Sequence, residues 1–276
     1  MLTSLSSAVS GLDSFQQDMD VIGNNIANIN TTGFKAGRVQ FADSFSDTLE
    51  AATANSVQVG TGVFDQAIGT NWTAGAASAT GINTDLAITG NGFFVVADPT
   101  TSAQYVTQDG SFSADPNGYL VTAGGQRVQG YSDAGLSTLG SIKIDTTGAP
   151  AASIAAGATV SSFTIDTKGK INVTLSDGTT FTRGQVLLQN FQDPQALVSQ
   201  SGNLYSNQAA AGPLTAMSAP GSSGLGSIQS GALELSNVDL SSEMANLITA
   251  QRGFEANSKI VTTSDEVLQT LVNMKR

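Results

Sequence analysis

The sequence contains no cysteine and no histidine among its 276 residues. Without cysteine there are no disulfides, no thiolate nucleophiles and no cysteine-based zinc sites. Without histidine the chain lacks the commonest general base and the commonest transition-metal ligand. An enzyme would have to be built from Asp, Glu, Lys and Ser alone, and no pattern of these residues assembles one. We therefore expect no catalytic residues, no metal site and no cofactor.

Charged and aromatic residues are also scarce, at 12% and 6% of the chain, whereas glycine occurs 30 times. The formal net charge is −11, and the sequence has no basic stripe that could displace counterions from nucleic acid. No apolar run reaches the length of a membrane span. No Sec-type signal peptide is visible, because acidic residues interrupt the first apolar stripe. The sequence predicts no nucleic acid binding and no membrane insertion.

Both ends of the chain carry apolar residues at helical spacing. In the first helix, expected to end by residue 33, the steps are three or four residues, and in the last helix, 239–276, they are seven. Such stripes are typical of helices that pack in coiled-coil fashion, and Asp239 is expected as the N-cap of the second. We predict that both stripes form an assembly interface, which comprises Leu5, Val9, Leu12, Phe15, Met19, Ile22, Ile26, Leu240, Leu247, Phe254, Val261 and Leu268.

Neither helix is expected to be stable alone, because burying one apolar stripe does not offset the entropy lost when the backbone is ordered. Each helix therefore needs a partner. That partner is the other terminus, another copy of the chain, or both. An ordinary two-helix layer on one globular domain is the alternative that the stripes leave open.

Between the helices the pattern changes to short β-strands and turns. Residues 34–81 are expected to form an extended linker or hairpin region, and 82–190 a β domain whose segment 140–185 is a small outer elaboration. Turn pairs such as Asn91-Gly92 and Asn117-Gly118 favour an antiparallel meander. Residues 191–238 are expected to be an irregular connector. The predicted fold class is α+β, with long N- and C-terminal helices packed together and flanking a mainly antiparallel β domain.

Three separated segments resemble a known family. Residues 24–35 resemble the N-terminal signature of bacterial flagellar axial proteins, which are the rod, hook and hook-associated components. Residues 85–94 resemble their shared β-domain motif, and residues 231–240 and 251–257 resemble the entry and continuation of their C-terminal helix. Gly253 departs from many members, which carry an aromatic residue or alanine at that position. The residues of the first motif are Asn24, Asn25, Ala27, Asn28, Thr32, Gly33 and Phe34.

The resemblance implies a structural subunit, not an enzyme, that polymerises through its terminal helices into a tube. Residues 41–45 and 125–131 are most similar to hook proteins, so the flagellar hook is the expected assembly, with the distal rod of the basal body as the alternative. Implied partners are further copies, neighbouring rod, hook-cap and hook–filament junction proteins, and the flagellar export apparatus. The implied location is the flagellum outside the cell, or the basal body for a rod protein. Two alternative functions from other classes remain, a surface β-rich adhesin and a carboxylate-based hydrolase.

Overall fold

The computed structural model describes residues 2–50, 57–214 and 216–274. The chain forms two compact units that interleave along the sequence. The helix unit comprises residues 1–29, 35–71 and 238–276, and the β unit comprises residues 30–34 and 72–237. Each unit therefore contains segments from both halves of the chain.

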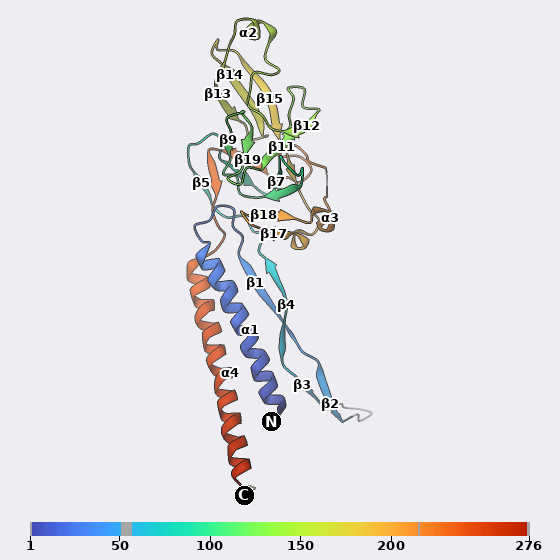
Figure 1. Ribbon diagram of the computed structural model, residues 1–276, viewed down its shortest axis with the longest axis vertical. Coiled ribbons are helices and arrows are strands. Elements are labelled where there is room, and N and C mark those ends of the chain that lie inside the picture. The colour runs from blue at the N-terminus through green and yellow to red at the C-terminus, as the bar shows by residue number, and fades with distance from the viewer. Residues whose placement is uncertain (1, 51–56, 215, 275–276) are drawn as a thin grey trace. The chain divides into compact units, whose positions relative to one another are not determined.

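The helix unit is built from two long helices and a two-stranded ribbon (Figure 1). Helix α1 spans Leu2–Ala27 and helix α4 spans Leu240–Met274. At a rise of 1.5 Å per residue, their 26 and 35 residues give lengths of about 39 and about 52 Å. Asp239 Oδ1 accepts a hydrogen bond from the backbone N–H of Ser241 at 2.9 Å. The predicted N-cap of the last helix is therefore confirmed.

The ribbon between the helices is antiparallel throughout. Strand β1 (Gly37–Asp43) pairs with β4 (Val63–Thr70), and β2 (Ser46–Glu50) pairs with β3 (Val57–Gly60). A register shift between Gln40 and Phe41 marks an irregularity in β1. The ribbon is held against α1 in part by Ser10, whose hydroxyl accepts a hydrogen bond from the backbone N–H of Val63 at 3.3 Å. Within residues 34–81, expected as an extended linker or hairpin region, the described residues thus form two antiparallel strand pairs.

The β unit is organised around one 12-stranded sheet, whose main path runs β13-β14-β15-β11-β7-β8-β18-β17 (Figure 1). The smaller pairs β19-β6 and β20-β5 lie outside this sheet. All these pairings are antiparallel. The strands are β5 (Ala77–Ala79), β6 (Leu86–Thr89), β7 (Phe93–Ala97), β8 (Gln104–Thr107), β9 (Ser113–Ala114), β10 (Leu120–Val121), β11 (Arg127–Tyr131), β12 (Leu139–Ser141), β13 (Val160–Ile165), β14 (Lys170–Leu175), β15 (Thr180–Val186), β16 (Leu188–Gln189), β17 (Val198–Gln200), β18 (Leu204–Ser206), β19 (Ser227–Ser230) and β20 (Ala232–Glu234).

Two apolar clusters form the core of the β unit. The larger one includes Phe94, Leu120 and Ile171, all fully buried, and extends from β6 to β19. The second is aromatic: the ring of Trp72 lies edge-on to those of Phe93 and Tyr205 at centroid distances of 5.2 and 5.0 Å. Three short helical segments, α2 (Ala151–Ala155), η1 (Pro194–Ala196) and α3 (Gln208–Ala211), complete the unit.

The α+β fold class is confirmed, but one segment differs from expectation. Residues 191–238, expected as an irregular connector, contribute β17 and β18 to the large sheet. They also contribute β19 and β20, which pair with β6 and β5. Each of these strands is only three or four residues long. The sequence pattern missed them because so few residues show no clear alternation, and their pairing partners lie up to about 155 positions away.

Candidate assembly site

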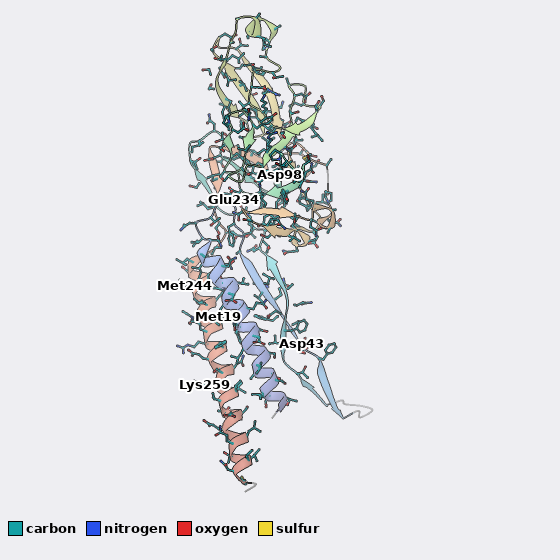
Figure 2. All side chains as sticks on the ribbon, viewed as in Figure 1. Met19, Asp43, Asp98, Glu234, Met244 and Lys259 are labelled. Carbon is teal, nitrogen blue, oxygen red and sulfur yellow. The ribbon has the colours of Figure 1, made fainter. Side chains whose placement is uncertain are left out.

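Helices α1 and α4 pack along one face of each other within a single chain (Figure 2). On α4 the less exposed positions recur at steps of three and four residues, which is the spacing of one helix face. These positions include Glu243, Leu247, Ala250, Phe254, Asn257, Val261, Ser264 and Leu268, and the neighbouring Gly253 and Ser258 are also less exposed. They comprise the seven-residue series expected from Leu247 to Leu268 and a companion series of smaller and polar side chains. One partner of each terminal helix is therefore the other terminus.

Two glycines let the helices approach closely. A methyl group on Gly253 would lie 2.4 Å from Cζ of Phe15, so the aromatic ring sits directly over the α4 backbone. In the same way, a methyl group on Gly11 would lie 2.5 Å from Nδ2 of Asn257. Each helix thus provides a hole for a side chain of the other, as in coiled-coil packing. The departure of Gly253 from the family pattern has a physical reason here, because Phe15 needs the space.

Most of the α1 residues predicted for the assembly interface are at least half-buried. Leu5, Leu12, Phe15, Met19 and Ile26 are half-buried, Ile22 is buried, and Val9 is exposed. Three small residues between them were not predicted, although all are buried: Ala8, Gly11 and Ser14. Besides α4, α1 also contacts strands β1 and β4 of the ribbon.

The predicted α4 residues divide into a packed group and an exposed end. Leu247, Phe254, Val261 and Leu268 are half-buried, whereas Leu240 is exposed. Other large apolar side chains of α4 that the seven-residue series does not include are exposed instead. They are Met244, Ile248, Ile260, Val267, Leu271, Val272 and Met274. The seam within one chain therefore leaves apolar surface on α4 uncovered.

Two carboxylates lie where α1 meets the ribbon. Burial raises the pKa of Asp18 on α1, and the neighbouring charge of Asp65 on β4 raises it further. Among the residues that the structure describes, Oδ1 of Asp65 is buried without a hydrogen-bond partner. The like charges oppose packing of α1 on β4 at neutral pH.

The first motif begins at the end of α1, where Asn25 joins the helix to β1. Its buried side-chain amide donates to the carbonyl oxygen of Gly37 at 2.8 Å and accepts from the N–H of Gly37 at 2.9 Å. Asn28 reaches back one turn, and its Nδ2 donates to the backbone and side-chain oxygens of Asn24 at 2.9 and 3.0 Å. Ala27 is the last residue of the helix and is exposed. Asn25 thus ties the end of α1 to the first residue of β1, and Asn28 adds side-chain hydrogen bonds across the last turn of the helix.

The second half of the motif belongs to the β unit. Thr32 Oγ1 donates to Oδ1 of Asp109 at 3.0 Å, and the N–H of Gly33 donates to the carbonyl oxygen of Glu234 at 2.9 Å. Gly33 has φ 66°, the left-handed conformation expected of it. A methyl group there would lie 2.7 Å from the backbone nitrogen of Asp109, so only glycine fits. Phe34 follows and is half-buried.

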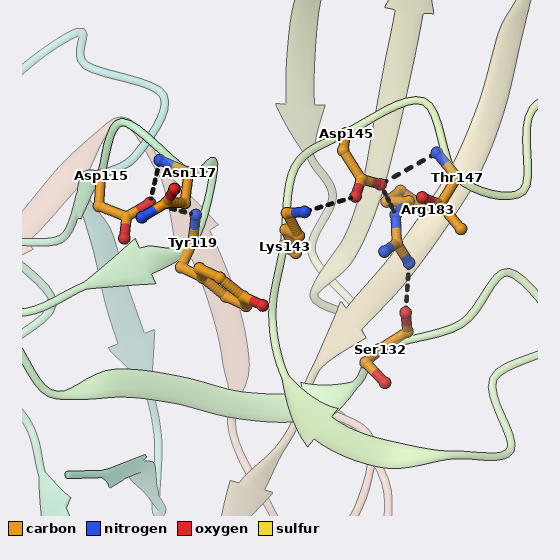
Figure 3. Close-up of polar contacts among 8 residues, drawn as sticks. All are labelled: Asp115, Asn117, Tyr119, Ser132, Lys143, Asp145, Thr147 and Arg183. Atoms are coloured by element: carbon orange, nitrogen blue, oxygen red, sulfur yellow. Dashed lines mark hydrogen bonds and ion pairs between the residues drawn. The ribbon is translucent and has the colours of Figure 1, made fainter. Parts of the chain in front are cut away.

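Charged side chains gather most closely around Asp145 in the β unit (Figure 3). The buried Arg183 guanidinium lies 2.6 Å from Oδ1 of Asp145 and also donates to the carbonyl oxygen of Ser132. Lys143 lies 3.2 Å from Oδ2 of the same carboxylate. Burial alone would raise the pKa of Asp145, but the hydrogen bonds from Arg183, Thr147 and Lys143 lower it to about 2. The buried charge is thus paired, which gives the cluster a structural role.

No group of acidic residues within the described ranges could hold a metal ion. Across those same residues, neither α1 nor α4, nor any shorter helix, has the length and apolar character needed to cross a membrane.

Three segments of the chain match known families. Residues 5–35 match the flagella basal body rod protein family, residues 87–173 the flagellar hook protein FlgE/F/G D1 domain, and residues 229–274 the C-terminal region of the flagellar basal body rod FlgEFG proteins. The flagellar basal-body rod protein FlgG of Bacillus subtilis is 40% identical over 284 aligned positions, which cover 100% of both chains. The chain belongs to the flagellar rod and hook protein family.

Other members of the rod and hook family match to different extents. FlgG of Borreliella burgdorferi is 34% identical, and the alignment again covers 100% of both chains. The flagellar hook protein FlgE of Treponema pallidum is 48% identical over 140 residues, but these are 48% of this chain and 30% of that protein. The crystal structure of the Helicobacter pylori hook protein FlgE2 gives a TM-score of 0.23 at 15% identity, over 66% of this chain and 47% of that chain.

Proposed function

We propose that the chain is a structural subunit of the flagellar rod that polymerises through its terminal helices. The observation that carries this proposal is the end-to-end similarity to FlgG rod proteins, which includes both terminal helices and the whole β unit. A rod subunit has no need of catalytic groups, cofactors or metal ions. The sequence pattern favours the hook, but the two rod proteins match over their full length and the hook protein over less than a third.

The hook remains the second candidate for one specific reason. The 140 residues shared with the Treponema pallidum hook protein are 48% identical, which exceeds the identity to the rod proteins over the full chain. Local identity reports that a domain is shared, whereas full-length coverage reports that the whole architecture is shared. We weigh the second more heavily because the alignment with the Treponema pallidum hook protein covers only 30% of that protein and 48% of this chain.

In either assembly the partners are further copies and the neighbouring rod, hook-cap and junction proteins. The proposed export route is the flagellar export apparatus. In the proposed tube the terminal helices make the contacts between copies, and residues 140–185 are a small outer elaboration of the β unit. The α1–α4 pair supports this reading, because it already brings both chain ends together.

Complementation distinguishes the two candidates. The gene is expressed in a Bacillus subtilis strain that lacks its own FlgG and, in parallel, in a strain that lacks its hook protein. We expect swimming in soft agar to return in the first strain only. Restored swimming in the hook-deficient strain alone would overturn the rod proposal in favour of the hook.

A seam variant serves as the control for the role of the helices. Leu247→Asp places a charge in the half-buried face between α4 and α1, at a cost of several kcal/mol. We expect it to abolish complementation while the β unit stays folded. Normal swimming with this variant would contradict assembly through the terminal helices.

A further inference from the structure

In the last two turns of α4 the large apolar side chains are exposed, apart from the half-buried Leu268. Gly11 lies opposite Asn257 and Phe15 opposite Gly253, so the position numbers of facing residues add to 268 in both cases. By this antiparallel register, the first residue of α1, Leu2, lies opposite about residue 266. Residues 267–274, the α4 overhang, therefore extend beyond the helix against which the rest of α4 packs.

The α4 overhang is amphipathic, and in the part of the chain that the structure describes its apolar side chains other than Leu268 are exposed. At 100° per residue its apolar side chains share one side, and Gln269, Thr270 and Asn273 occupy the opposite side. Exposed fractions on the apolar side are 46% for Val267, 47% for Leu271, 65% for Val272 and 79% for Met274. This side continues the seam that packs on α1. The overhang contains no charged residue, so desolvating it leaves no ion unpaired.

A second exposed apolar patch lies at the opposite end of the same helix. Leu240, Met244 and Ile248 follow one another at four-residue steps and are 44%, 44% and 58% exposed. Met244, the middle residue of the three, is labelled in Figure 2. We call this the α4 entry patch. Only one charged residue, Glu243, lies within residues 240–248, and it is half-buried. The helix pair thus presents one apolar patch at each end, with little charge at either.

Two different patches at opposite ends of one element are suited to a head-to-tail contact. A contact of this kind is heterologous, and it generates an open helical filament when the rotation between copies does not close a ring. We propose that the α4 overhang of one copy packs against the α4 entry patch of a second copy. This inference rests on the proposed function and identifies which apolar surface joins the copies: it is a different surface from the seam, which is already used within each chain.

The first test compares two charge insertions within the overhang. Leu271→Asp lies on the apolar side, and Asn273→Asp adds the same charge two residues away on the polar side. We expect Leu271→Asp to raise the concentration at which purified chain forms tubes by at least tenfold, and Asn273→Asp to leave it within twofold of the wild type. Because Leu271 and Asn273 are both exposed, neither variant should change the melting of the helix pair measured by ellipticity at 222 nm.

The second test identifies the partner surface. The natural chain has no cysteine, so Met274→Cys provides a single thiol for a photoreactive maleimide. We expect cross-links in the tubes to join residue 274 to residues 240–248 of another copy. Cross-links between two overhangs, cross-links to the β unit, or no cross-link between copies would overturn the inference.

The outcomes also separate this inference from the proposed function. If the wild type forms tubes and Leu271→Asp forms them at the same concentration, only the overhang contact is wrong. If the wild type forms no tubes under any condition, both the contact and the proposed function are contradicted.

Discussion

Replacing Gly253 by alanine tests the close packing of the terminal helices. In an open helix interior, Gly→Ala stabilises by about 1 kcal/mol, because glycine has the higher conformational entropy in the unfolded chain. At Gly253 the new methyl group would lie within 2.4–2.8 Å of three ring atoms of Phe15. Such overpacking costs about 1–3 kcal/mol, since the ring must leave its rotamer or the helices must separate. We expect a net loss of up to about 2 kcal/mol.

Gly23 provides the matched control, because it lies in α1 and a methyl group there would meet nothing within 4 Å. Gly23→Ala should stabilise the helix unit by about 1 kcal/mol. The two variants should then differ by about 1–3 kcal/mol. A difference of 1 kcal/mol corresponds to about 4–8 °C in Tm for a unit of 60–100 residues.

The assay follows from the distribution of chromophores. The single tryptophan and all four tyrosines lie in the β unit, whereas α1 and α4 lie in the helix unit. Ellipticity at 222 nm therefore reports mainly on the helices, and tryptophan fluorescence reports on the β unit. We expect Gly253→Ala to lower the first melting temperature and leave the second unchanged. A variant that melts at or above the Gly23→Ala temperature would refute the close contact between Phe15 and α4.

Three further predictions concern the β unit and the ribbon. Gly33→Ala should lower the melting temperature measured by fluorescence more than Gly125→Ala does. Both glycines have positive φ, but only at Gly33 would the added methyl group meet backbone atoms. Equal decreases in melting temperature would contradict the packing at Gly33. The pKa of Asp145 is lowered to about 2, so its stabilising contribution is complete above its unfolded pKa near 3.8 and disappears as pH falls toward 2. Asp145→Asn should therefore lower the β-unit melting temperature at pH 7. An unchanged melting temperature would count against the ion pair. The pKa of Asp18 is raised, so its ionised form opposes folding above that pKa. Asp18→Asn should raise the melting temperature measured at 222 nm at pH 7 and leave it unchanged at pH 3. A lower melting temperature at pH 7 would contradict this prediction.

Long-period features of the sequence were predictable. The seven-residue repeat from Leu247 to Leu268 is visible without a structure, because helical periodicity extends over many residues and tolerates local exceptions. Asp239 as an N-cap and Gly33 in a left-handed turn were also predictable, because each depends on one residue type at a helix boundary.

Features that depend on distant partners were not predictable. The holes at Gly11 and Gly253 exist only because Asn257 and Phe15 lie opposite them, and periodicity gives the face of a helix but not its register against another. The exposed overhang follows from that same register. Asn25 was assigned to the motif, but its paired hydrogen bonds to Gly37 require the chain to turn back after the helix. Gly253 itself was the one signal available, because it departed from the family pattern.

The exposed positions of Val9 and Leu240 show the limit of assigning an interface from one stripe. Both fit the apolar spacing, yet they remain 46% and 44% exposed. Val9 directly follows the buried Ala8, so it points about 100° away from that side chain around the helix. Leu240 is the first residue of α4. Their predicted part in assembly remains a prediction about contacts between copies.

Electron microscopy of the purified chain tests the central claim most directly. Negative-stain images are recorded over a series of rising protein concentrations, with the wild type and Leu247→Asp treated identically. Assembly through the terminal helices predicts tubes of constant diameter above a threshold concentration for the wild type and none for the variant. Tubes of the same diameter from both chains, or wild-type protein that stays monomeric throughout the series, would contradict it.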